Sequence, residues 1–189
     1  SIPCQPYDTK TFRAALSAMR SLSCETDPRV FVPKLQALAA AAGVAVVFVP
    51  APPRCRVSGA TQWLSADRAL IALSLRHKTN DHLWFTLFHE AGHILKHGKK
   101  ATFVDGLDGK DVEQEAEADR FAADQLIPPA AAQKLKGLRS EQEVRAIAEA
   151  LRIAPGIVVG RMQHEGWLPH THLKGLKVSY RWSEEESDD

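Results

Sequence analysis

Residues 80–97 read NDHLWFTLFHEAGHILKH, and this stretch decides which fold the chain can adopt. Asn80 and Asp81 are typical of a helix start, and Gly98 is a residue at which a helix ends. We therefore expect one helix from residue 80 to about residue 97. A dense set of apolar residues around its centre would bury it against a core: Leu83, Trp84, Phe85, Leu87, Phe88, Ile94 and Leu95.

The centre of this helix carries the pattern H-E-x-x-H at residues 89–93. Its two histidines, His89 and His93, lie on one helical face, so both imidazoles can reach one metal ion. Imidazole is a good ligand for zinc, and a catalytic zinc site uses three protein ligands and keeps a fourth position for water. Glu90 is then the general base, which takes a proton from that water. The competing interpretation, two hydrogen-bonded core histidines, does not account for the spacing and the intervening glutamate.

The third metal ligand must come from another element. An extended histidine motif would need Gly at position 96 and His at position 99, and the chain has lysine at both. His97 follows His93 on the same helix, one position too near. A carboxylate from the next predicted helix, residues 111–126, is the better candidate.

That helix carries two pairs of acids on different faces. Glu115 and Asp119 are four residues apart and adjoin the apolar stripe of the helix, so they should point inward. A ligating glutamate with an aspartate one turn later is chemically sensible, because the aspartate can accept the free N–H of a ligating histidine and orient it. Glu113 and Glu117 share another face, which we interpret as solvated.

The rest of the chain predicts further helices and a few strands. The helices should cover residues 9–22, 27–43, 140–151 and 155–165, and the strands 44–49, 57–64 and 69–75. Residues 99–110 should be a loop. Pro128-Pro129 should end the predicted helix of residues 111–126. This order indicates an α+β fold in which a small sheet backs two central helices.

Composition suggests a cytoplasmic protein. The three cysteines are scattered, and neither a secretory signal nor an apolar run of membrane-spanning length is present. Because the chain starts at Ser1, we expect a segment upstream. We expect residues 1–135 to form the main domain, 136–180 a small helical subdomain packed on it, and 181–189 a disordered acidic tail.

Two stretches resemble the ImmA/IrrE family of zinc metallopeptidases. They are WFTLFHEAGHILKH at residues 84–97 and EAEADRFAADQLIP at residues 115–128. The chain departs from the family's consensus at Phe88, where a small residue is frequent. The resemblance implies a zincin-like, thermolysin-type fold that binds one Zn²⁺ per chain. It also makes Glu115 the third zinc ligand, next to His89 and His93.

The resemblance further implies a function. Members of the family cleave helix-turn-helix repressors, so a protein substrate of that kind is expected. Residues 153–177 also look like the end of long HigA-like antitoxin regulators, which join a helix-turn-helix to an ImmA-type domain. In that case the DNA-binding part lies upstream, and this fragment does not bind nucleic acid or a membrane itself.

Three functions compete on these observations. The first is a zinc endopeptidase, favoured by Glu90, because a purely structural zinc site needs no general base. The second is a non-catalytic zinc-bound sensor domain of a DNA-binding antitoxin. The third is nucleic-acid binding through basic residues of the C-terminal helices, which lack interleaved aromatics. Those basic residues are Lys134, Lys136, Arg139, Arg145, Arg152 and Arg161.

Substrate binding should involve a sheet edge, because an extended peptide can pair with an exposed strand. The strand around residues 58–64 is the candidate, and Gly59, Ala60 and Thr61 would form the substrate-binding positions. Gly59 and Ala60 are small enough to let another backbone approach. The residue that stabilises the oxyanion stays open among four candidates: Arg76, His77, His82 and Tyr180.

Overall fold

The computed structural model describes residues 2–50, 57–98, 102–104 and 112–181. The predicted acidic tail lies outside these residues except for Arg181, and so does most of the predicted loop before the acidic helix. Within the described part, no helix combines the length and the apolar composition that crossing a bilayer requires.

The described residues form seven α-helices and a four-stranded sheet, so the predicted α+β fold is confirmed. The helices are α1 (Thr9–Leu22), α2 (Pro28–Ala40), α3 (Asn80–Lys96), α4 (Val112–Leu126), α5 (Pro129–Leu135), α6 (Glu141–Leu151) and α7 (Pro155–His164), followed by a 3₁₀ turn, η1 (Lys174–Leu176).

Helix α5 is absent from the sequence prediction, although Pro128-Pro129 correctly marks the end of α4. Pro129 occupies the first turn of α5. Proline fits that position because the N–H it lacks would have no partner inside the helix, and its φ angle already suits the helix. The same pair of prolines therefore ends one helix and starts the next.

The sheet has the strand order β1-β3-β2-β4, with β1 (Val44–Phe48), β3 (Arg68–Leu73), β2 (Gly59–Ser65) and β4 (Thr102–Val104). β1 runs parallel to β3, and β2 is antiparallel to both β3 and β4. β4 lies inside the stretch predicted as a loop, and that prediction is wrong at these three residues. A strand of this length is too short to show a period in the sequence.

The position of β2 overturns the predicted edge strand. Ala60 pairs with Ala72 on one side and with Val104 on the other, and Thr61 pairs likewise with Ile71 and Phe103. Main-chain donors and acceptors used in two ladders cannot pair with a peptide. Ala60 and Thr61 therefore do not bind substrate by strand addition, and Gly59 pairs with Leu73 of β3.

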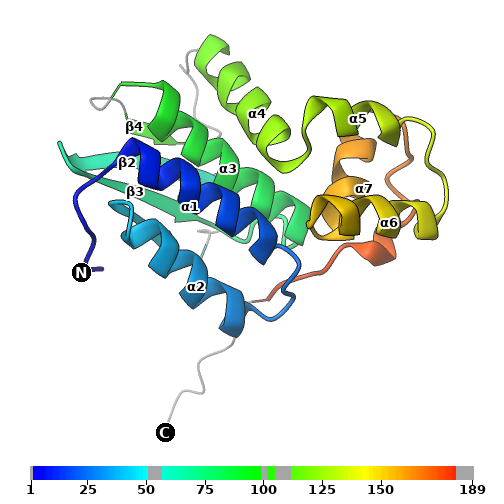
Figure 1. The fold of residues 1–189 in the computed structure, drawn as a ribbon, viewed down its shortest axis with the longest axis horizontal. Coiled ribbons are helices and arrows are strands. Elements are labelled where there is room, and N and C mark those ends of the chain that lie inside the picture. Colours follow the sequence, from blue (N-terminus) through cyan, green and yellow to red (C-terminus); the bar gives the residue numbers. More distant parts are fainter. Residues whose placement is uncertain (1, 51–56, 99–101, 105–111, 182–189) are drawn as a thin grey trace, which may run out of the picture.

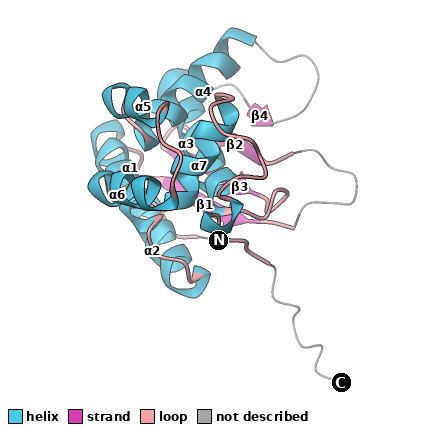
Figure 2. Ribbon diagram, turned by 90° about the vertical axis from the view of Figure 1, so that its right-hand side faces the viewer, coloured by secondary structure: helices cyan, strands magenta, loops and turns pink. Residues whose placement is uncertain are grey.

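The helices gather on one side of the sheet (Figures 1 and 2). The burial of β3 follows from this arrangement: Ala69, Ile71 and Leu73 are buried, and the residues between them are half-buried. Such alternation is typical of a strand that packs one face against helices.

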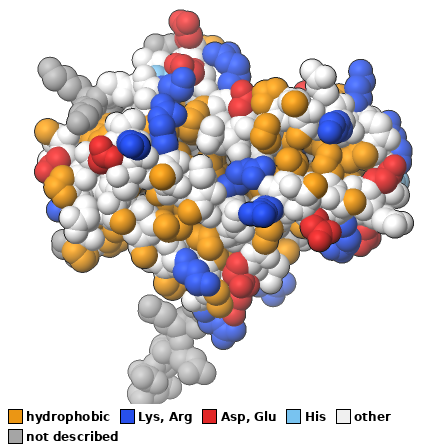
Figure 3. All heavy atoms as spheres, in the orientation of Figure 1, with side chains coloured by type: hydrophobic (Ala, Val, Ile, Leu, Met, Phe, Trp, Pro, Cys, Tyr) orange, Lys and Arg blue, Asp and Glu red, His pale blue; other side chains and the backbone are white. Residues whose placement is uncertain are grey.

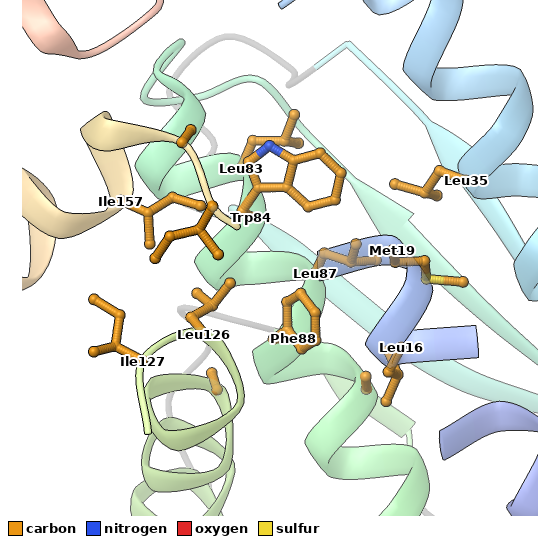
Figure 4. Close-up of a cluster of buried hydrophobic side chains, with 14 of the residues drawn as sticks. Leu16, Met19, Leu35, Leu83, Trp84, Leu87, Phe88, Leu126, Ile127 and Ile157 are labelled. Carbon is orange, nitrogen blue, oxygen red and sulfur yellow. The ribbon is translucent and has the colours of Figure 1, made fainter. Parts of the chain in front are cut away.

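Helix α3 runs through the centre of this layer, and its apolar side chains pack against neighbours from several elements (Figure 4). Trp84 and Phe88 are fully buried there, with Leu16 and Met19 of α1 on one side. Residues as late as Tyr180 belong to the same core cluster. The division into domains at residue 135 stays a prediction.

Candidate metal centre

His89 and His93 lie one turn apart on α3 and point to the same place. Their Nε2 atoms are 3.0 Å apart, and the residues are 7% and 1% exposed. Buried imidazoles need partners for both ring nitrogens, because an unsatisfied buried polar atom costs roughly 1–3 kcal/mol. The shared direction of the Nε2 atoms therefore indicates a common ligand.

Close packing between α3 and α4 supplies the third group. A Cβ atom at Gly92 would come within 3.2 Å of the Cα of Ala118, so the motif glycine and this alanine allow the two helices to approach. One turn before Ala118, Glu115 places its carboxylate oxygens 3.3 Å from Nε2 of His89 and 3.4 Å from Nε2 of His93. The ligand atoms of these three residues lie within 4.8 Å of one another.

This donor set fits zinc. Zinc takes histidine nitrogen and carboxylate oxygen at about 2.0–2.2 Å in a tetrahedron, which separates neighbouring donor atoms by about 3.3 Å. The two Nε2 atoms are 3.0 Å apart, and each has one oxygen of Glu115 at a similar distance: Oε2 is 3.3 Å from His89 and Oε1 is 3.4 Å from His93. Three protein ligands also leave one position of the tetrahedron for water, as catalytic zinc sites do.

Asp119 lies where its predicted role requires. Its Oδ1 is 2.8 Å from Nδ1 of His89, the ring nitrogen that does not face Glu115. In the metal-free chain, burial disfavours the charged imidazole, but the hydrogen bond to Asp119 and the nearby carboxylates outweigh burial and raise the pKa of His89. The contact fixes the orientation of the His89 ring.

His93 has a corresponding partner that the sequence did not reveal. Its Nδ1 is 2.9 Å from Nδ1 of His97, and Nε2 of His97 is 3.4 Å from Oε2 of Glu117. Glu117 also contacts Nζ of Lys96 at 3.3 Å, so its half-exposed side chain is not simply solvated. The four-residue spacing of His93 and His97 was the available signal, because such pairs share a helical face.

Glu90 is held by strand β2. It is 1% exposed, and the Thr61 hydroxyl donates to its Oε2 at 2.6 Å. A Cβ atom at Gly59 would lie 2.5 Å from Oε1 of Glu90, so only glycine leaves room for this carboxylate. The close approach predicted at Gly59 is real, but the approaching group is the Glu90 side chain and not a substrate backbone.

The four residues that the sequence offers for stabilising the oxyanion differ in their surroundings. Tyr180 is 4% exposed and packs on Phe31, with 5.5 Å between ring centroids, which places it in the core. His82 and His77 stack with centroids 4.4 Å apart, and partial burial lowers the pKa of His82. Arg76 is exposed.

A comparison with protein-family models matches residues 40–163 to the peptidase M78 family, described as the IrrE N-terminal-like domain. The match covers about two thirds of the chain and includes α3 and α4, which carry the three candidate ligands. No curated protein gives a significant match to the chain.

Proposed function

The chain belongs to the family of IrrE N-terminal-like domains, and from this premise we propose that it is a zinc-dependent endopeptidase. The family is of the zinc metallopeptidase type, so the chain carries a metallopeptidase-like domain. His89, His93 and Glu115 are the proposed zinc ligands, and Glu90 is the proposed general base. One observation carries the proposal. The carboxylate of Glu90 is not needed for metal binding, yet Thr61 orients it beside the three converging ligands.

The proposed mechanism assigns a proton-transfer role to Glu90. When bound, zinc would polarise the scissile carbonyl and make water acidic. Glu90 accepts a proton from the attacking water on its carboxylate and passes it to the leaving nitrogen. Thr61 holds that carboxylate in one orientation by donating to Oε2, and Asp119 and His97 hold the rings of His89 and His93.

The proposed substrate is a helix-turn-helix transcriptional repressor in the cytoplasm. The resemblance of residues 84–97 and 115–128 to ImmA-type peptidases supports this substrate class, and that of residues 153–177 to HigA-like regulators supports a place in a toxin–antitoxin or stress-response regulator. Nucleic acid is not a proposed ligand, because Arg145 and Arg161 each pair with an acid four residues away, at 2.7 and 2.9 Å. On the face in Figure 3, basic side chains lie scattered among acidic and apolar ones.

A non-catalytic zinc-bound sensor domain is the second candidate. The deep burial of Glu90 favours it, because a general base must reach a water molecule and this residue is 1% exposed. In that case zinc binding would stabilise the packing of α4 on α3 and so control an attached DNA-binding domain.

Cleavage of a proteome-derived peptide library, followed by mass spectrometry, distinguishes these two functions. The zinc-loaded chain should cut the library, and Glu90→Gln should keep its zinc and lose cleavage, because the amide cannot accept a proton. Glu149→Gln, at an exposed position of α6, is the matched control and should cut normally. Identical fragments from the wild-type chain and Glu90→Gln would contradict the peptidase and support the sensor.

A further inference from the structure

We propose that a cavity beside the metal centre receives an apolar side chain of the polypeptide on which the centre acts. The inference rests on the proposed function, because it assumes that a polypeptide lies at the metal centre. It adds a substrate class, namely segments with a large apolar residue close to the scissile bond.

The cavity has a volume of about 360 Å³ and lies between α3, α4 and α7. Asp119 lines it, and Oδ1 of the same residue is 2.8 Å from Nδ1 of His89. Phe85 also lines it, with its ring centroid 6.4 Å from that of His89. Asp119 and Phe85 therefore border both the cavity and His89, a proposed metal ligand.

The walls of the cavity are mainly apolar. The apolar part of the wall is formed by Phe85, Ala123, Leu126, Ile127, Ile157 and Gly160, and the polar lining residues are Asp81, His82, Asp119, Arg120, Arg161, His164 and Glu165. Leu126, Ile127 and Ile157 gather beside α3 in Figure 4 and are at most 4% exposed, so the floor of the cavity is part of the rigid core. A preformed apolar hollow of a few hundred Å³ is typical of a site that takes an organic group.

One charged residue that lines the cavity, Asp81, is buried and already paired. The side chain of Asp81, which lines the cavity, is 8% exposed, and its Oδ2 pairs with Nζ of Lys177 at 2.6 Å. Its Oδ1 is buried and has no hydrogen-bond partner among the described residues. This oxygen has almost no accessible surface, so an occupant of the cavity does not reach it. Because Lys177 already neutralises Asp81, a cationic side chain is not favoured there.

The test measures binding rather than turnover. The probes are capped seven-residue alanine–glycine peptides with a single central Leu, Phe, Asp or Lys, and the protein is the zinc-loaded Glu90→Gln variant, which leaves them intact. Burial of one large apolar side chain should make the Leu and Phe peptides bind at least about tenfold more tightly than the Asp and Lys peptides.

A cavity-filling variant ties this preference to the cavity. Ala123→Phe, added to Glu90→Gln, should remove the advantage of the Leu and Phe peptides and leave the zinc content unchanged. Ala146→Phe places the same side chain at an exposed position of α6, away from the cavity, and should keep the advantage.

Several outcomes would overturn the proposal. They are equal binding of all four peptides, binding of none of them, tighter binding of the Lys peptide, or an advantage that persists in Ala123→Phe. The proposed peptidase function fails by a different result, namely intact library peptides after incubation with the wild-type chain. The two failures are therefore separable.

Discussion

At the scale of single residues, Thr61 shows how a strand residue can serve a site on a helix. Its side chain is 1% exposed and its hydroxyl lies 2.6 Å from Oε2 of Glu90. Thr61→Val keeps the shape of the side chain and removes the donor, which leaves a buried carboxylate without that partner. We expect kcat to fall by about 10–100-fold with little change in KM, because Thr61 acts through Glu90 and not on the substrate.

Two controls separate positioning from general damage at this residue. Thr61→Ser retains the hydroxyl and should keep most of the activity. Metal analysis should find full zinc content in both variants, since Thr61 contacts none of the three ligands in the described structure. Wild-type kcat in Thr61→Val, or loss of zinc from it, would contradict the role.

At the scale of elements, the approach of α3 and α4 decides whether a metal can bind. A Cβ atom at Gly92 would lie 3.2 Å from the Cα of Ala118 and 3.2 Å from Cδ1 of Phe121. Gly92→Leu should push α4 away and carry Glu115 with it, so zinc affinity should fall by about tenfold or more, as when support of a ligand is lost. Competition with a chromophoric chelator measures this affinity.

The matched control for this prediction is Gly98→Leu. A Cβ atom at Gly98 would meet nothing within 4 Å, so this variant should bind zinc normally. The intrinsic effect of Gly92→Leu on α3 is stabilising by about 0.5–1 kcal/mol, because glycine is a poor helix former. Unchanged zinc affinity in Gly92→Leu would show that the packing of α4 does not position Glu115.

At the scale of the whole molecule, the end of the described chain secures the start of α3. Val178 donates its N–H to Oδ1 of Asn80 at 3.1 Å, and Asn80 donates its N–H to the carbonyl of Val178 at 2.8 Å. Two residues later, Tyr180 enters the core against Phe31. The start of α3 is therefore tied to the C-terminal stretch, and Phe31 of α2 packs against both Trp84 and Tyr180.

Removal of the Tyr180 ring should destabilise the entire chain. Tyr180→Ala should lower the free energy of unfolding by about 3–5 kcal/mol, the usual cost of deleting a buried aromatic side chain. Arg181→Ala, at the exposed neighbouring residue, should cost little. Urea denaturation of both variants, with zinc present at the same concentration, measures the difference. A loss below about 1 kcal/mol would mean that the C-terminal stretch is not part of the folding unit.

Local patterns in the sequence determined every described α-helix except α5, and also the residues of the candidate site. The spacing of His89 and His93 follows from the helical period, and so does the pairing of Glu115 with Asp119 on one face of α4. These relations hold within one helix, where the geometry of the backbone places each side chain. Helix α1 and the start of α3 were predictable for the same reason, since capping residues and apolar spacing act over a few residues.

Contacts between distant parts of the chain were decided only by the tertiary structure. Nothing near Thr61 in the sequence indicates that its strand lies between β3 and β4, because strand order depends on pairings between residues far apart. The positions of Thr61 under Glu90 and of Glu117 beside His97 have the same origin. Sequence periodicity tells which face of an element is apolar, but the packing of the whole core determines the partner of that face. For this reason a strand predicted to bind a peptide instead supports the Glu90 side chain.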